Sequence, residues 1–86
     1  MKRTEVTYGQ LDKVLRSLGF SCRLVTHDPP PARVYEHEES GAIITIPPFP
    51  MSDFVFEHHL LIARTTADQF GIADPKVFDG KLQKAG

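Results

Sequence analysis

Residues 20–48 read FSCRLVTHDPPPARVYEHEESGAIITIPP, and this stretch decides the fold. Apolar and polar side chains alternate before and after three consecutive prolines, and a β-branched run follows the turn at 39–41. Period-two alternation is typical of strands with one buried face, and prolines interrupt strands because they lack an N–H donor. The short connections favour antiparallel pairing. The stretch therefore predicts a three-stranded antiparallel sheet with strands at 20–26, 32–38 and 42–46.

The sequence before the sheet carries the boundary signals of a helix. Thr7 and Gln10 have the spacing of a capping box, in which each side chain accepts from the other residue's backbone N–H. Gly19 provides the left-handed residue that commonly ends a helix. These signals predict a helix over residues 8–18, with one apolar stripe formed by Leu11, Val14, Leu15 and Leu18.

A second helix is predicted over residues 53–70, although its start could lie several residues later. Ser52 occupies an N-cap position, and Asp53 is favourably placed against the helix dipole. Gly71 followed by Ile72 fits a Schellman ending. Apolar residues recur at spacings of four and three, which is typical of one helical face: Phe56, Leu60, Ala63, Ala67 and Phe70.

A short third helix is predicted over residues 75–84, because Asp74 suits the N-cap and Pro75 the first helical position. The order helix, strand, strand, strand, helix, with this helix appended, predicts one two-layer α+β domain over residues 1–86. Both longer helices should pack on one face of the sheet. We expect the core to contain apolar side chains from four successive elements: Phe20, Leu24, Ile44, Ile46, Leu60 and Phe70.

The composition of the 86 residues, 41% apolar and 24% charged, is that of an ordinary globular chain. No apolar run approaches the ~20 residues that span a bilayer, and no apolar segment of a signal peptide follows the first residues. We therefore expect a cytoplasmic protein that does not bind membranes. Cys22 is expected to be a buried, reduced core residue. The net charge of −1 argues against strong non-specific binding to nucleic acid but is compatible with a local basic patch.

The four histidines, His27, His37, His58 and His59, lack the usual spacing of metal ligands. His58 and His59 are adjacent, so on a helix their side chains point about 100° apart and do not easily share one ion. We expect one of these two to pack in the interior and the other to be solvated. No phosphate-binding loop, nucleophile elbow or paired-cysteine motif occurs. The sequence predicts neither a metal site nor a cofactor.

Arg33, Tyr35 and His37 are the most specific candidates for a site, because alternation places all three on one face of one strand. Arginine can grip phosphate with two hydrogen bonds, tyrosine can stack on a base, and histidine can transfer a proton near neutral pH. We expect this face to be open and to form a surface for RNA or for a partner. An amphipathic strand with a polar outer face is the plainer interpretation.

With these residues, the chain resembles the HicA-type (YcfA-like) toxins, small RNA-cleaving proteins with a double-stranded-RNA-binding-domain-like fold. The resemblance covers roughly residues 7–47. It consists of a leading helix closed by Leu18-Gly19-Phe20, a strand, the run Arg33-Val34-Tyr35-Glu36-His37, a turn, and an apolar strand ending in Ile46-Pro47. The family typically has G-S-H, two variable residues, an aromatic, one more residue and a histidine. Tyr35 and His37 match the last two of these positions.

The family's catalytic histidine falls at Ala32, whose side chain cannot transfer a proton. The resemblance therefore implies a catalytically impaired mRNA interferase fold from a toxin–antitoxin system, which binds RNA or a HicB-like antitoxin through Arg33, Tyr35 and His37. Two alternatives stay open. One is an active, metal-independent ribonuclease that uses a displaced histidine, His27 or His37, and the other is an unrelated protein-interaction module.

Overall fold

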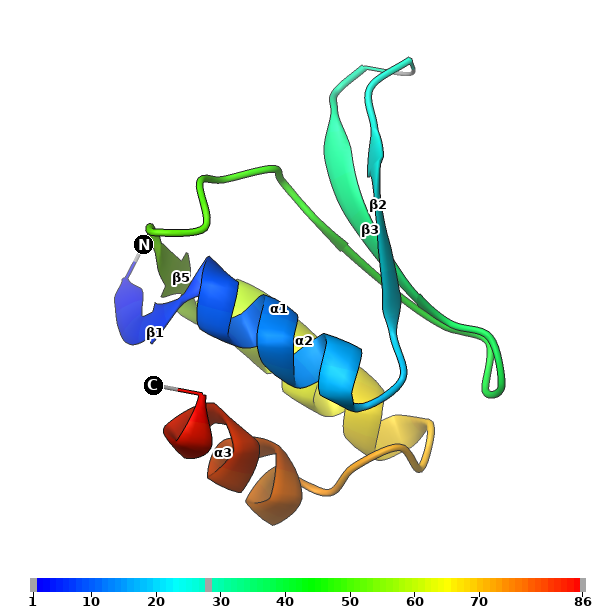
Figure 1. Ribbon diagram of the computed structural model, residues 1–86, viewed down its shortest axis with the longest axis vertical. Helices are drawn as coiled ribbons and strands as arrows, with labels where there is room; N and C mark the ends of the chain where they lie inside the picture. Colours follow the sequence, from blue (N-terminus) through cyan, green and yellow to red (C-terminus); the bar gives the residue numbers. More distant parts are fainter. Residues whose placement is uncertain (1, 28, 86) are drawn as a thin grey trace.

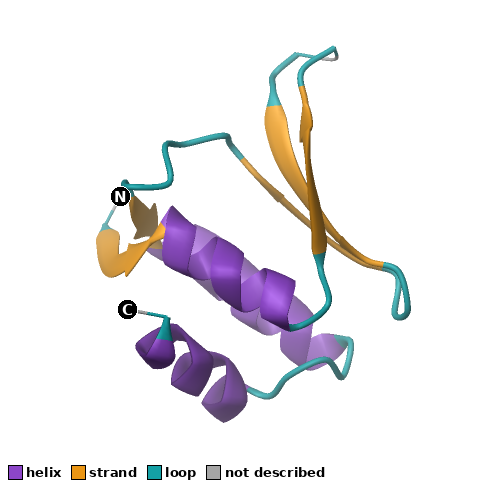
Figure 2. Ribbon diagram, viewed as in Figure 1, coloured by secondary structure: helices purple, strands orange, loops and turns teal. Residues whose placement is uncertain are grey.

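The computed structural model describes residues 2–27 and 29–85 (Figure 1). The described residues form an α+β arrangement, as expected, of helices packed beside a long β-hairpin (Figure 2). In chain order the elements are β1 (Arg3–Thr7), α1 (Tyr8–Ser17), β2 (Ser21–Val25), β3 (Ala32–His37), β4 (Ala42–Ile46), β5 (Phe54–Phe56), α2 (Glu57–Gln69) and α3 (Pro75–Lys84).

The predicted three-stranded antiparallel sheet is confirmed, with the order β2-β3-β4. Tyr35 in the central strand lies opposite Cys22 on one side and Ile44 on the other. Each strand begins and ends within one residue of its expected bounds. The alternation of side chains in residues 20–48 was therefore sufficient to set both the strands and their pairing.

The capping signals of α1 are confirmed. The Thr7 hydroxyl accepts from the backbone N–H of Gln10 at 3.2 Å, and the Gln10 side chain accepts from the backbone N–H of Thr7 at 2.7 Å. At the other end, Gly19 has φ of 97°, a conformation that side chains with a Cβ rarely adopt. Its N–H donates to the Arg16 carbonyl, and the Phe20 N–H donates to the Leu15 carbonyl. This hydrogen-bond pair is the Schellman ending.

The helix α2 begins at Glu57, which agrees with the later start that the sequence left open and not with a start at residue 53. Residues 54–56 instead form β5, which pairs antiparallel with β1. The side chain of Val55 is fully buried, as the alternation of a short half-buried strand requires. Ser52 therefore does not cap α2, whose N-cap is Phe56, without a side-chain hydrogen bond. Neither β1 nor β5 was predicted.

The later boundaries follow the expected signals. Gly71 and Ile72 donate to the carbonyls of Asp68 and Ala67, which is again the Schellman pattern. The Asp74 carboxylate accepts from the Val77 N–H at 2.9 Å and caps α3, whose bounds agree with the prediction.

The helices lie on one face of the three-stranded sheet. The helix α1 contacts β2, α2 contacts β4, and α3 packs against both α1 and α2 (Figure 1). Figure 1 shows α3 beyond the other two helices, away from the sheet, and the end of β2 and the start of β3 projecting past the helices. Among the described residues, no helix is long and apolar enough to cross a membrane.

Four of the six expected core residues, Phe20, Ile44, Ile46 and Leu60, are buried. The other two expectations were wrong. Leu24 is 58% exposed although it shares the inner face of the sheet, because it lies near the end of β2 that is farther along the chain from α1, next to the β2–β3 connection. Phe70 is 48% exposed because it follows the last turn of α2. The largest fully buried side chain is instead Phe78 of α3, with no exposed surface.

Replacing Phe78 with alanine should lower the free energy of unfolding by about 3–5 kcal/mol, because the change removes a fully buried ring. Phe70→Ala is the matched control, and it should cost only about 1 kcal/mol because nearly half of this residue is exposed. Urea denaturation of the two variants measures the difference. Equal losses would show that α3 does not supply the main aromatic contact of the core.

Candidate functional site

Arg33, Tyr35 and His37 share one face of β3, as predicted, but this face is the inner one. In the register of the sheet they lie opposite Ile46, Ile44 and Ala42, all three of which are buried. The expected open face was therefore wrong. The outer face instead carries the alternate residues of β3, of which Val34 and Glu36 are half-buried.

Tyr35 is a structural residue rather than part of a surface. Its side chain is 2% exposed, and its hydroxyl donates to Asp12 Oδ1 of α1 at 2.7 Å. Burial, together with this hydrogen bond, raises the pKa of Tyr35 well above its usual value. The hydroxyl thus keeps its proton and joins the central strand to α1. Its ring has no free face on which a base could stack.

Arg33 is also committed to an internal contact. One guanidinium nitrogen donates to the carbonyl oxygen of Phe49, in the segment that follows β4, at 3.1 Å. The side chain is half-buried. It holds the segment between β4 and β5 against the sheet, so part of its donor capacity is unavailable for phosphate.

His37 organises the turn between β3 and β4. Its Nδ1 accepts from the Ser40 backbone N–H at 3.2 Å and lies 2.8 Å from the Ser40 hydroxyl. The ring packs on Phe20, with the centroids 5.3 Å apart. A Cβ at Gly19 would lie 3.2 Å from Nε2, so the ring would have to shift by a few tenths of an ångström to admit a larger residue there. The hydrogen bonds at Nδ1 and the contact with Phe20 hold the imidazole in place.

The two candidate catalytic histidines lie at opposite ends of β3. His27 is exposed in the β2–β3 connection, whereas His37 adjoins the β3–β4 turn. The first and the last of the six residues of β3 are roughly 17 Å apart, at a rise of about 3.3 Å for each step along the strand. Ala32, where the family pattern has its catalytic histidine, is on the opposite face of the strand from Tyr35 and His37. No pair of proton-transfer groups is assembled from these residues.

His37 borders two shallow depressions, of about 670 and 410 Å³. Glu36, Glu38 and Glu39 line the first, and the exposed ring of Phe70 lines the second. Glu36 pairs with Arg23 at 2.6 Å, while Glu38 and Glu39 are exposed. We call this surface the His37 corner, defined by Leu18, His37, Glu38, Glu39 and Phe70. It is both acidic and apolar.

A second cluster of polar and aromatic side chains, around Tyr8 and His59, was not predicted from the sequence. The Tyr8 hydroxyl lies 2.8 Å from Nδ1 of His59 and accepts from the Phe56 backbone N–H at 3.4 Å. The ring of Tyr8 stacks on Phe49 at 5.2 Å. No sequence signal could have revealed the link, because Tyr8 and His59 are 51 residues apart. Tyr8 and His59 thus fill the core between the N-terminal ends of α1 and α2.

The two adjacent histidines differ as expected, since His59 is buried, at 7% exposure, and His58 is exposed. Burial, and secondarily the charge of His58, lower the pKa of His59. Burial also raises the pKa of Tyr8. Both shifts favour the neutral forms that share the hydrogen bond. Within residues 2–27 and 29–85, no three or more histidine, cysteine or acidic side chains are grouped to hold a metal ion.

Comparison with known proteins gave no match to a family model, to a curated protein or to a solved structure.

The free energy of unfolding should fall as the pH is lowered below about 6.5, the usual pKa of histidine. The unfolded chain protonates His59 near that pH, whereas the folded chain does so only at a lower one, so stability is complete above it and is lost as the pH falls through the lowered pKa. Urea denaturation between pH 7.5 and 5, chosen to bracket that range, measures the slope. His59→Gln should flatten the slope and His27→Gln should not. An unchanged slope in His59→Gln would contradict the assignment.

Proposed function

We propose that the chain is a HicA-like domain without ribonuclease activity, which binds a protein partner of the HicB-like antitoxin type at the His37 corner. The observation that carries the proposal is the separation of His27 from His37, because His27 precedes β3 and His37 is the last residue of that strand, which spans roughly 17 Å. General acid–base catalysis needs its groups within hydrogen-bond reach of the reacting atoms. In this proposal the domain works in the cytoplasm, where the single thiol of Cys22 stays reduced.

The chemistry of the His37 corner favours a protein over RNA. Glu38 and Glu39 are exposed there and would repel phosphate groups. The same surface exposes nearly half of the Phe70 ring, and aromatic side chains are enriched in protein interfaces. A partner segment with basic and apolar side chains is complementary to both features.

The HicA-like assignment rests on the helix, the three strands and the matching positions of Tyr35 and His37. The active-ribonuclease alternative needs His27 or His37 to leave its place and meet a second proton-transfer group, and His37 is held by Ser40 and Phe20. An unrelated interaction module would share the His37 corner but not the HicB-like partner. The two experiments below separate these alternatives.

The wild-type domain should not cleave RNA above the background rate, because a positioned proton-transfer group is commonly worth ~10²–10⁴-fold in rate. His27→Ala and His37→Ala should not change the result. Ala32→His should restore little, since the new imidazole would lie on the face of β3 opposite Tyr35. A gel assay with a long mRNA measures cleavage. Clear wild-type activity that is lost in either alanine variant would establish the active-ribonuclease alternative.

Charge reversal at the His37 corner should weaken partner binding. The partner to test is the purified product of a HicB-like reading frame beside the gene, and titration calorimetry measures its affinity. Glu39→Lys should raise Kd at least about tenfold, because it places like charges together across the interface. Glu5→Lys is the matched control, since it makes the same charge change at an exposed position on β1 and should leave Kd unchanged.

Equal effects of Glu39→Lys and Glu5→Lys would move the interface away from the His37 corner. No binding of the HicB-like protein by a wild-type chain that unfolds cooperatively in urea would reject the antitoxin-type partner and favour the unrelated interaction module.

A further inference from the structure

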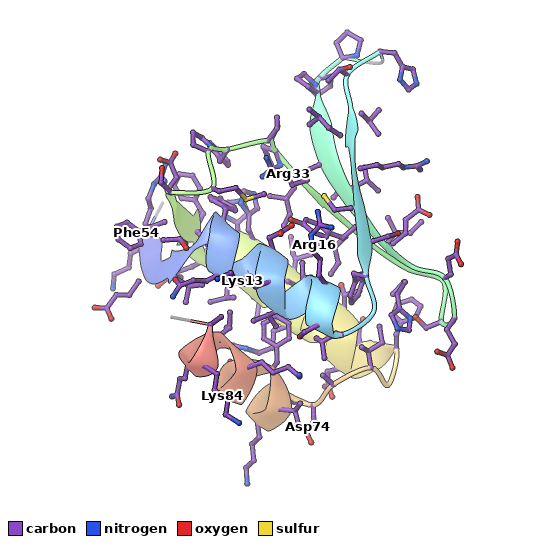
Figure 3. The ribbon with its side chains drawn as sticks, in the orientation of Figure 1. Lys13, Arg16, Arg33, Phe54, Asp74 and Lys84 are labelled. Atoms are coloured by element: carbon purple, nitrogen blue, oxygen red, sulfur yellow. The ribbon has the colours of Figure 1, made fainter. Side chains whose placement is uncertain are left out.

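A depression of about 260 Å³ lies between α1 and α3, and lysines surround it. Lys13 comes from α1, while Lys81 and Lys84 come from α3; Figure 3 labels Lys13 and Lys84 on their two helices. Lys13 and Lys84 are exposed and Lys81 is half-buried. The buried side chain of Val14 contributes an apolar part of the lining. We call this feature the lysine groove.

Between described residues, the three lysines of the groove form no ion pair. The positions three and four residues before and after each of the three lysines, as far as the structure describes them, contain no carboxylate. The ion pairs between described residues use arginines only: Arg3, Arg16, Arg23 and Arg64. Three of the five lysines of a chain with net charge −1 are thus gathered around one hollow.

We propose that the lysine groove binds the backbone phosphates of single-stranded nucleic acid. Lysines bind phosphate as point charges, and three of them on two facing helices can neutralise neighbouring phosphates of one chain. A hollow between two helices can receive a single strand of nucleic acid, whereas binding to a flat bilayer surface would need side chains that project from the protein. The inference goes beyond the proposed function, because the lysine groove and the His37 corner share no lining residue.

The lining predicts binding without sequence preference. It contains lysine, serine, valine and alanine side chains, but no aromatic ring to stack on a base and no amide or arginine to read a base edge. The Ser17 hydroxyl donates to the Val14 carbonyl at 2.7 Å, so its proton is already used within α1. DNA and RNA strands of one sequence should therefore bind equally, because nothing in the lining is arranged to recognise the 2′-hydroxyl.

The salt dependence of binding tests the number of contacts. Three phosphate contacts predict a slope of about −2 for log K against log salt concentration, at about 0.7 per contact on a single strand. Fluorescence anisotropy with a labelled mixed-sequence oligonucleotide, as DNA and as RNA, gives the slope and Kd from low to physiological salt. The double variant Lys13→Gln and Lys84→Gln should weaken binding at least about tenfold at low salt and reduce the slope to about −0.7.

The double variant Lys2→Gln and Lys76→Gln is the matched control, because it removes the same charge from exposed lysines outside the groove. It should stay within about twofold of wild type. Urea midpoints should agree among all proteins, and if the groove pair unfolds, Lys84→Gln alone should reduce the slope by about 0.7. Equal weakening by both pairs, or no wild-type binding up to ~0.1 mM, overturns the proposal. The proposal is also overturned if the protein binds phosphatidylserine vesicles through the lysines of the groove and binds neither oligonucleotide.

Discussion

The buried hydroxyl of Tyr8 is the contact on which the arrangement of the remaining elements depends. It meets His59 of α2 and the backbone of Phe56, while the N–H of Tyr8 itself donates to the Asp53 carbonyl. One residue thus joins the start of α1, the start of α2 and the end of the segment between β4 and β5. An unpaired hydroxyl or imidazole in this interior would cost about 1–3 kcal/mol, so the three parts are held in one relative position. Both helices can then lie on the same face of the sheet.

The polar residues of β3 serve the same purpose on the sheet side. Tyr35 joins β3 to α1 through Asp12, Arg33 joins it to the Phe49 carbonyl, and His37 caps the turn to β4. A set of arginine, tyrosine and histidine is often interpreted as a recognition surface. Here each side chain satisfies a polar group of the same chain, and buried polar groups require such partners. The exposed side chains of the His37 corner, Glu38, Glu39 and Phe70, lie outside β3, and under the proposed function they would make most of the contact with a partner.

Local signals predicted most of the fold, and contacts distant in sequence explain what they missed. Neighbouring residues determine the caps of α1 and α3 and the strands of residues 20–48. These elements could therefore be predicted from the sequence alone. Residues 54–56 fit a helical stripe equally well, and only pairing with β1 about fifty positions earlier makes them a strand. The inner face of β3 was misjudged because tyrosine is both apolar and polar, and only Asp12 in α1 decides where its hydroxyl lies.

The net charge of the chain is low, but its two kinds of basic residue have different surroundings. Arginines form the ion pairs of the described residues, which suits a planar group with donors in a fixed geometry. Lysines hold a compact, strongly hydrated charge on a flexible stem, so they lose less by facing solvent. The exposed charges of the His37 corner and of the lysine groove are therefore opposite in sign and lie on separate surfaces: Glu38 and Glu39 on the first, Lys13 and Lys84 on the second. Two surfaces of opposite sign attract different ligands, and a partner on one need not displace a strand from the other.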